Sequence, residues 1–226
     1  MKIPTHIAFI MDGNRRWAKS HKLEILFGHD KGAKLIEPLT EYAQSKGVKH
    51  VTFWAFSTEN WNRSEKELEM LMTVFRELVN GPMVKRMMAK NVRINTIGDI
   101  SKFPKDIYES LLRLRKDSEK NTGIQAIFGL NYGGRAEILK AVNELLQKKI
   151  KKVDEKTFSD HLFTAGTPDP DMIIRTGGEM RLSGFLPWQS AYAEYYFTQT
   201  LWPDFDEKEL EKALKDYEAR ERRFGK

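Results

Sequence analysis

A short apolar run near the start of the chain ends on an acidic residue. Asp12 is followed by Gly13 and Asn14, and then by a basic segment with a helical pattern. This order predicts a buried strand that delivers Asp12 to a strand-to-helix turn. Ligands of open α/β sheets bind beyond the carboxyl ends of strands, so Asp12, Arg15 and Arg16 could hold a metal-bound diphosphate. The alternative is an ordinary Asp-Gly-Asn turn before a solvated basic helix.

Two later stretches also place polar side chains directly after an apolar run. The first follows residues 50–56 and contains Ser57, Thr58, Glu59, Asn60, Trp61 and Arg63. The second follows residues 172–174 and contains Arg175, Arg181, Leu182 and Ser183. Parallel strands end at one edge of a sheet, so we expect both groups to lie near Asp12. Arginine suits a diphosphate because its planar fork binds two oxygens and stays charged, although Thr58 and Glu59 could equally serve helix entry before Ser64.

The sequence resembles the cis-prenyltransferases, the family of the undecaprenyl diphosphate synthases. Five motifs in the family's order carry the resemblance, from Ile7 to Gly225. They are Met11-Asp12-Gly13-Asn14-Arg15-Arg16-Trp17-Ala18, Phe27-Gly28-His29 with Gly32, Ala55-Phe56-Ser57-Thr58-Glu59-Asn60-Trp61-Asn62-Arg63, Asn131-Tyr132-Gly133-Gly134-Arg135, and Ile174-Arg175-Thr176-Gly177-Gly178-Glu179 continuing through Arg181-Leu182-Ser183. Five long motifs in register are specific, whereas a single Asp-Gly-Asn is not.

The resemblance implies a Mg²⁺-dependent enzyme acting on two diphosphates. It would condense an allylic diphosphate of the farnesyl type with successive isopentenyl diphosphates. The implied product is a long-chain, undecaprenyl-type diphosphate that serves as the lipid carrier of cell-wall synthesis. The family also implies a homodimer. The Asp-Asp-x-x-Asp clusters of the all-helical trans-prenyltransferases do not occur here.

The same resemblance assigns roles to individual residues. Around Asp12, the essential carboxylate, the allylic diphosphate would be contacted by Gly13, Asn14, the Arg15 backbone, Arg16, Trp17, His29 and Arg63. The isopentenyl diphosphate would lie against Arg175, Arg181, Leu182 and Ser183, with Arg223 of the ending Arg223-Phe224-Gly225 reaching in from the partner subunit. Asp12 and Glu194 would provide the carboxylates of the magnesium site.

The family also implies that the new bond forms beside Ser57 and Asn60, with Thr58, Glu59 and Trp61 among the substrate contacts. Asn60 would assist removal of the proton from isopentenyl diphosphate. A neutral amide is a poor base, so we expect Asn60 to orient the substrate and the leaving diphosphate to take the proton.

Two positions depart from the family pattern. Ile25 stands where many members carry an arginine that grips the allylic diphosphate, and Arg15 stands where many have glycine. Either Arg15, Lys19 or Lys22 substitutes for the missing arginine, or the allylic substrate binds more weakly.

Composition and periodicity predict one α/β domain over residues 1–226. The chain is 40% apolar and has no low-complexity tract. Six strand-like runs, most of them separated by helical patterns, predict a mainly parallel six-stranded sheet with helices on both faces. These runs are residues 6–11, 50–56, 92–98, 124–130, 172–175 and 195–198. A chain without cysteine fits a reducing compartment, so we expect a soluble, cytoplasmic protein whose membrane contact is peripheral, at the inner face and through its product.

Helical periodicity marks the remaining segments. Residues 31–46 form one predicted helix, whose N-terminal approach at residues 28–32 would present free amides and His29 to an anion. Residues 64–90 form another, opened by a capping box and broken at Gly81-Pro82. The family suggests that its inner face, with Leu71, Phe75, Leu78 and Val79, lines a tunnel for the growing polyprenyl tail, opposite residues 124–128. The alternative is that this face only packs on the core. Outer helices are predicted over residues 104–120, 136–149 and 207–222.

A net charge of +6 also admits other interpretations. One is a basic nucleic-acid-binding module with aromatic residues near its arginines, at Trp17, Trp61 and Trp188. That hypothesis does not explain why two carboxylates, Asp12 and Glu194, would lie inside a site that binds anions. We therefore expect no nucleic-acid partner. The other is a non-catalytic prenyltransferase subunit, against which the intact set of Asp12, Asn60, Arg175, Arg181 and Ser183 argues.

Overall fold

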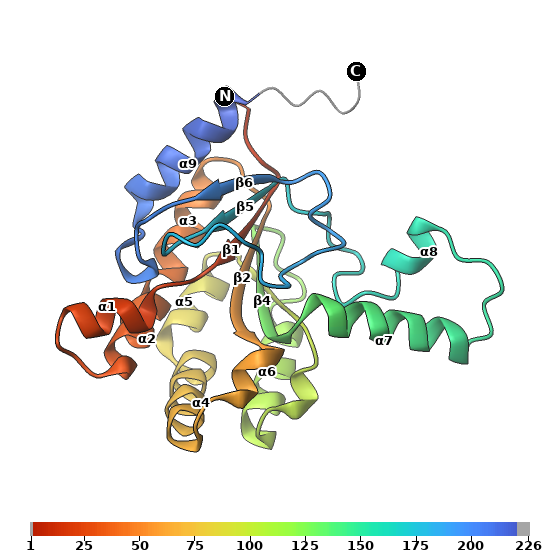
Figure 1. The fold of residues 1–226 in the computed structure, drawn as a ribbon, viewed down its shortest axis with the longest axis horizontal. Helices are drawn as coiled ribbons and strands as arrows, with labels where there is room; N and C mark the ends of the chain where they lie inside the picture. The colour runs from red at the N-terminus through yellow and green to blue at the C-terminus, as the bar shows by residue number, and fades with distance from the viewer. Residues whose placement is uncertain (1, 221–226) are drawn as a thin grey trace.

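The computed structural model describes residues 2–220 and contains one six-stranded sheet (Figure 1). All five neighbouring pairs are parallel, and the strand order is β3-β4-β2-β1-β5-β6. The strands are β1 (His6–Ile10), β2 (His50–Ser57), β3 (Arg93–Ile97), β4 (Gln125–Tyr132), β5 (Met172–Arg175) and β6 (Glu194–Phe197). The predicted α/β class and strand positions are confirmed.

Helices connect these strands, and most lie where the sequence predicts. The α-helices are α1 (Asn14–Ser20), α2 (Ile25–Lys34), α3 (Ile36–Ser45), α4 (Glu65–Asn80), α5 (Pro82–Ala89), α6 (Lys105–Asp117), α7 (Gly134–Gln147), α8 (Glu155–Ser159) and α9 (Glu207–Ala219). The short 3₁₀ helices are η1 (Thr58–Asn62), η2 (Ile100–Lys102) and η3 (Trp202–Asp204).

The single helix predicted over residues 31–46 is wrong, because two helices meet there at Leu35. Pro38 explains the division, since it has no N–H to donate to the carbonyl of Lys34. The first helix, α2, already begins at Ile25, so residues 28–32 lie inside it. Their amides are therefore not the free first-turn amides that the sequence suggested.

The long segment over residues 64–90 divides as predicted. Gly81 ends α4, and Pro82 occupies the first position of α5, where its missing N–H costs nothing. The Ser64 hydroxyl accepts a hydrogen bond from the Glu67 amide at 3.4 Å. The Glu67 carboxylate, however, accepts from Arg63 Nη1 at 2.9 Å, so only half of the predicted capping box is seen.

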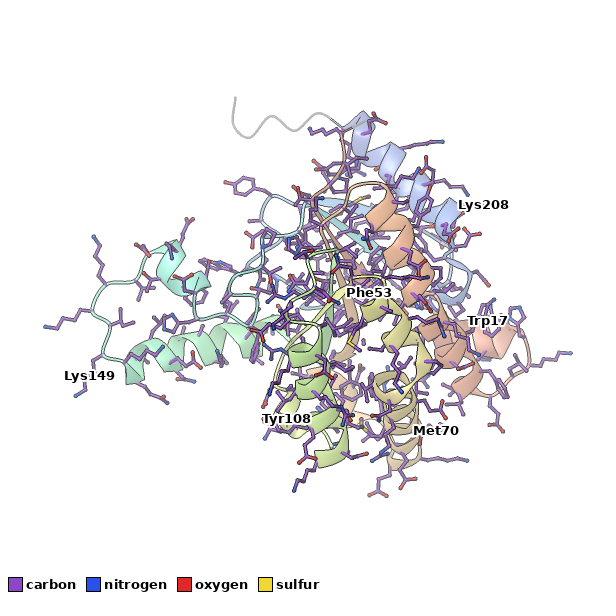
Figure 2. All side chains as sticks on the ribbon, turned by 180° about the vertical axis from the view of Figure 1, so that it is seen from behind. Trp17, Phe53, Met70, Tyr108, Lys149 and Lys208 are labelled. Carbon is purple, nitrogen blue, oxygen red and sulfur yellow. The ribbon has the colours of Figure 1, made fainter. Side chains whose placement is uncertain are left out.

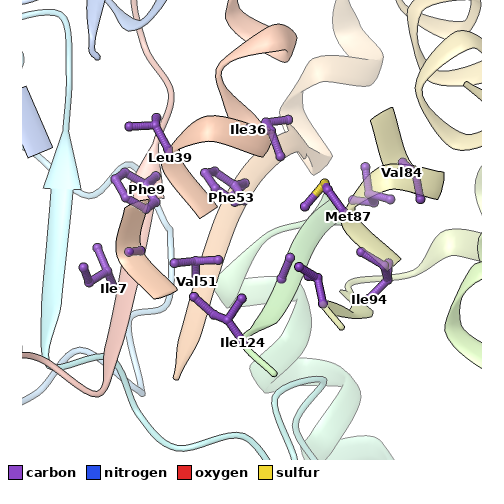
Figure 3. Close-up of a cluster of buried hydrophobic side chains, with 14 of the residues drawn as sticks. Ile7, Phe9, Ile36, Leu39, Val51, Phe53, Val84, Met87, Ile94 and Ile124 are labelled. Carbon is purple, nitrogen blue, oxygen red and sulfur yellow. The ribbon is translucent and has the colours of Figure 1, made fainter. Parts of the chain in front are cut away.

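The two faces of the sheet are covered differently. On one face, helices α3, α4, α5, α6 and α9 enclose the larger core, in which Phe9 and Phe53 stack with ring centres 5.1 Å apart (Figure 3). On the other face, a smaller core forms around Ile173 and Tyr132 and is closed by Phe185, which stacks on Trp54 at 4.9 Å. The helical cover is thus uneven, and part of the second face is covered by the loop that carries Arg181 and Ser183.

Helices α7 and α8 project from the rest of the molecule as an arm (Figure 1). Lys149 lies at the tip of this arm, at the opposite end of the molecule from Trp17 in α1 (Figure 2). Leu139, Val142 and Leu146 form an exposed apolar stripe along α7. Within residues 2–220, no helix combines the length and the apolar character that crossing a bilayer requires.

Candidate active site

The turn after β1 requires glycine. Gly13 has φ 114°, and a side chain on it would meet Leu201 at about 3 Å. Helix α1 begins at the next residue. The predicted strand-to-helix turn is therefore present, and Asp12 stands at the carboxyl edge of the sheet.

Asp12 links two arginines that come from opposite ends of the sequence. Its Oδ1 lies 3.2 Å from Arg16 Nη2, and its Oδ2 accepts a hydrogen bond from Arg175 Nη2 at 3.0 Å. Arg175 is only 5% exposed, and its Nη1 also donates to Ser183 Oγ at 2.9 Å and to the carbonyl of Arg181. One carboxylate thus joins the turn after β1 to the loop after β5.

A cavity of about 410 Å³ opens at this edge of the sheet; we call it the main cavity. Its lining combines charged and amide side chains with an apolar wall. The predicted site residues that line it are Asp12, Asn14, His29, Ser57, Glu59, Asn60, Arg63, Arg175 and Ser183. Strand ends and helices far apart in the sequence therefore bring half of the predicted site together.

His29 faces this cavity from the interior of α2. Burial, together with the nearby charge of Arg63, lowers the pKa of His29 to about 4, so the ring is neutral at physiological pH. Its Nε2 is buried and has no hydrogen-bond partner in the protein. The same is true of Asn14 Oδ1 and Arg175 Nε. A buried polar atom without a hydrogen-bond partner destabilises the folded protein. Three such atoms occur on residues that line this cavity, and a bound polar ligand would provide the missing partners.

Arg15 does contribute charge near the cavity. Its Nη1 lies 3.9 Å from Glu67 Oε1, the oxygen that also accepts from Arg63. Ile25, Lys19 and Lys22 do not line the cavity. Of the three cations considered as substitutes for the missing arginine, the structure brings only Arg15 beside the site.

The segment η1 has two faces, and this divides the residues predicted around the reaction centre. Ser57, Glu59 and Asn60 face the main cavity, and the Asn60 Oδ1 accepts from the Ser57 amide at 2.9 Å. Thr58 and Trp61 instead line a separate hollow of about 710 Å³. The structure does not bring these two to the main cavity, because η1 turns them toward Asn131 and α7.

Three further predicted contacts support the site without lining it. Trp17 is buried and donates from Nε1 to Asp204 Oδ1 at 2.9 Å. Arg181 is exposed and pairs with Glu179 at 2.5 Å. Leu182 packs on the smaller core. The Arg181 backbone carbonyl accepts a hydrogen bond from Arg175, which does line the cavity.

Within one chain, the structure does not bring the expected metal ligands Asp12 and Glu194 together. Glu194 begins β6 at the level of Met172 and Ile7, whereas Asp12 lies beyond the opposite end of β1. Five residues of extended chain separate the two levels by about 16 Å. Glu194 instead pairs with Arg220 at 2.8 Å, and no cluster of three metal-binding side chains occurs within residues 2–220. Arg223 lies outside the described residues.

The apolar wall of the main cavity lies partly where the family suggested. Leu71, Phe75 and Leu78 of α4 line it, together with Val74. Val79 does not, and the strand predicted opposite, residues 124–128, is also wrong. The apolar lining from the sheet is instead Ile10 of β1 with Trp54, Ala55 and Phe56 of β2, because β2 and not β4 neighbours β1 in the sheet order.

Sequence reasoning missed the buried carboxylate of Glu137, in the first turn of α7. It accepts from Tyr132 Oη at 2.6 Å, from Gln189 Nε2 at 3.0 Å and from the Phe163 amide at 2.8 Å. These bonds hold the end of the loop that carries Ser183. The sequence does hold a signal for this residue. Glu137 comes just after the Gly133-Gly134 motif, in the first turn of a predicted helix, where a negative charge interacts favourably with the helix dipole.

Comparison with known proteins identifies the family. Residues 10–225 match a sequence model described as "Putative undecaprenyl diphosphate synthase". An isoprenyl transferase of Fusobacterium nucleatum is 46% identical over 99% of this chain and 96% of its own length. One from Streptococcus pneumoniae is 45% identical over 99% of this chain and 92% of its own.

Solved structures agree with this assignment. Lavandulyl diphosphate synthase from Lavandula x intermedia, in complex with dimethylallyl diphosphate, matches with a TM-score of 0.95 at 36% identity over 99% of this chain and 98% of that one. A probable undecaprenyl diphosphate synthase from Campylobacter jejuni matches with a TM-score of 0.84 at 29% identity over the whole of both chains. The chain therefore belongs to the cis-prenyltransferase (undecaprenyl diphosphate synthase) family and is a transferase of prenyl groups.

Proposed function

We propose that this chain extends an allylic diphosphate of the farnesyl type by successive isopentenyl diphosphates, with Mg²⁺, to an undecaprenyl-type diphosphate for the lipid carrier of cell-wall synthesis. The main cavity is the observation that supports this most. Asp12, Arg63 and Arg175 make it polar at the sheet edge, while Leu71 and Phe75 make it apolar along α4. A substrate with a charged head and a long hydrocarbon tail matches both parts.

Two diphosphates need two groups of donors. The allylic diphosphate is assigned to the α1–α2 side, with Asn14, Arg16 and His29. The isopentenyl diphosphate is assigned to the loop after β5, with Arg181 and Ser183. The Lavandula enzyme, whose structure contains dimethylallyl diphosphate, supports an allylic substrate in a fold of this kind.

Asp12 is the residue that would hold Mg²⁺. It lines the cavity, and its side chain is one-third exposed. Mg²⁺ usually keeps several waters and is bound by one or two carboxylates together with substrate phosphates, so a single carboxylate fits when a diphosphate is present. The ion would offset negative charge on the leaving diphosphate, while Arg16 and Arg175 hold its oxygens.

The reaction breaks the C–O bond of the allylic diphosphate and forms a C–C bond to isopentenyl diphosphate, which then loses a proton. Asn60 Oδ1 is already occupied by the Ser57 amide, which fixes the side chain beside the cavity. We assign Asn60 an orienting role, and the departing diphosphate takes the proton because it is the stronger base.

We also propose a homodimer. The exposed stripe of Leu139, Val142 and Leu146 on α7 supports this, because contiguous exposed apolar surface marks protein contacts. The ending Arg223-Phe224-Gly225 would reach the isopentenyl site of the partner. Deleting residues 223–226 should lower turnover while sedimentation still reports a dimer, and a fully active truncated protein would refute the cross-subunit role.

The deciding experiment incubates the protein with labelled isopentenyl diphosphate and allylic starters of increasing length, with Mg²⁺ or with EDTA, and separates the products by chain length. We expect a ladder that ends at long chains, and none with EDTA. A product of one condensation only would reject elongation. Absence of turnover with every starter would favour the non-catalytic subunit.

A further inference from the structure

The segment between β6 and α9 contacts the loops of both proposed diphosphate sites. The Thr198 carbonyl accepts from the Gly178 amide at 2.8 Å, and the Thr200 carbonyl accepts from the Gly177 amide at 2.8 Å. Two residues later, the Trp202 amide donates to the Asp12 carbonyl at 3.0 Å. The segment of residues 198–204 therefore fixes the backbone on either side of the Asp12–Arg175 pair.

Its last residue, Asp204, holds α1 and α2 together. The Oδ1 atom accepts from Trp17 Nε1 at 2.9 Å and from Lys31 Nζ at 2.8 Å. The Lys31 ammonium also lies 4.2 Å from the centre of the Trp17 ring. One carboxylate oxygen thus binds a side chain from each helix, and the cation–π contact closes the triangle.

Trp202 fixes the same helix from inside. Its Nε1 donates to the Gly32 carbonyl at 2.9 Å, and its side chain lines the main cavity. A Cβ on Gly32 would stand 2.6 Å from the Trp202 ring, so only glycine allows the backbone of α2 to lie this close to Trp202. The position of α2 is therefore set by η3 at Gly32 and at Lys31.

This position matters because α2 forms one side of the main cavity. His29, Ala33 and, at the start of α3, Ile36 line it, and α1 contributes Arg16 to Asp12. Movement of α1 and α2 away from η3 would withdraw the groups assigned to the allylic diphosphate. The groups after β5 would stay, because they are held separately by Arg175 and Glu137.

We propose that Asp204 is a positioning residue for the allylic site, which it serves by clamping Trp17 of α1 and Lys31 of α2 onto η3. The proposal rests on the proposed function, since it assumes two separate diphosphate sites. Asp204 does not line the main cavity, so its effect must pass through the helices.

The test compares Asp204→Ala and Asp204→Asn with a matched control on α2. Asp30→Ala removes a carboxylate of similar exposure that pairs with Lys34 at 2.6 Å and does not involve η3. For Asp204→Ala we expect the KM of the allylic substrate to rise about tenfold, the scale of one charge-assisted hydrogen bond, with the KM of isopentenyl diphosphate unchanged. Asp204→Asn keeps an acceptor oxygen, so its KM for the allylic substrate should lie between those of the unmodified protein and Asp204→Ala.

A second measurement does not depend on turnover. Amide hydrogen exchange in α1 and α2 should be faster in Asp204→Ala than in Asp30→Ala, with β1 and β5 unchanged in both. Equal rises of both KM values, an effect of Asp30→Ala equal to that of Asp204→Ala, or unchanged exchange in α1 and α2 would overturn the proposal. If the unmodified protein condensed no isopentenyl diphosphate, the proposed function would fail, but the exchange result would still report whether Asp204 holds these helices.

Discussion

At the scale of single residues, the pairing of Asp12 with a buried arginine changes how its role should be tested. Removing the Asp12 side chain would leave the buried charge of Arg175 without its carboxylate partner, which would destabilise the fold. A loss of activity in Asp12→Ala could therefore reflect either catalysis or stability. Asp12→Asn keeps the shape and one acceptor oxygen. We expect its turnover to fall at least about a hundredfold, on the scale of losing a transition-state electrostatic contact, with a melting temperature within a few degrees. Near-normal turnover would reject the central role of Asp12.

Arg175 and Arg181 should also differ in a way that the sequence did not suggest. Arg175 bonds to both Asp12 and Ser183, so Arg175→Ala should raise the KM of both substrates. Arg181 is exposed, and within residues 2–220 its hydrogen bonds are with Arg175 and Glu179. Arg181→Ala should therefore raise the KM of isopentenyl diphosphate about tenfold or more and leave the allylic KM unchanged. Steady-state kinetics with each substrate varied in turn measures this, and parallel losses in Arg181→Ala would contradict the two-site division.

The residues of the site could be predicted where they depend on strand ends, and not where they depend on side-chain direction. Asp12 lies just beyond β1, and Ser57 and Arg175 are the last residues of β2 and β5, so their common edge follows from a parallel sheet. Thr58 and Trp61 lie in the same motif, but a 3₁₀ turn points neighbours in different directions, which the sequence does not reveal. Glu194 begins β6, so within one chain it lies toward the end of the sheet opposite to Asp12.

At the scale of elements, the inner face of α4 should set the length of the product. Each C5 unit buried in a dry cavity gains up to about 4 kcal/mol, so growth continues until the tail meets a wall. Leu78→Trp should shorten the products and Phe75→Ala should lengthen them or broaden their distribution, because both residues line the main cavity. Chromatography of the extracted products measures this.

Val79 provides the control for that prediction. It neighbours Leu78 but lies in the larger core and not on the cavity. Val79→Trp should lower the melting temperature through overpacking and leave the product lengths unchanged. If Leu78→Trp and Val79→Trp gave the same products, α4 would have only a packing role.

The elements themselves were predictable because their apolar periods are strong. The six strands and α4 through α7 begin and end within a few residues of the predictions. The exceptions have local causes, such as Pro38 dividing α2 from α3. The short helix α8 lacked enough apolar residues to show a period. The sheet order could not be predicted, since periodicity does not say which strands become neighbours, and this is why the tunnel was assigned to β4 instead of β2.

At the scale of the whole molecule, a buried histidine should make stability depend on pH. Burial lowers the pKa of His6 to about 4, and the neutral ring bonds to Pro168 and Thr52 at 2.7 Å. An unfolded histidine binds its proton near pH 6.5, so between pH 6.5 and 4 the unfolded state holds more protons and stability falls as pH falls. We expect a loss of about 2 kcal/mol from this residue by pH 5.

Denaturant unfolding at pH 7.5 and pH 5 measures that loss. His29 acts in the same direction, because its pKa is also lowered to about 4. A His6→Asn variant should therefore be less stable at pH 7.5 but lose less stability on acidification than the unmodified protein. An identical pH dependence in the variant would contradict the contribution of His6.

The central place of β1 also has a consequence for how the chain is made. Ile10 pairs with Trp54 of β2 on one side and with Arg175 of β5 on the other. The edge of β1 that pairs with β5 therefore has no partner until a segment some 165 residues later has been synthesised. A ribosome-bound chain that ends before β5 has its Asp12 turn but lacks the Arg175 loop, and it carries the open edge of a mainly apolar strand. Chaperone binding should therefore be strongest on nascent chains of intermediate length and should fall once β5 has emerged.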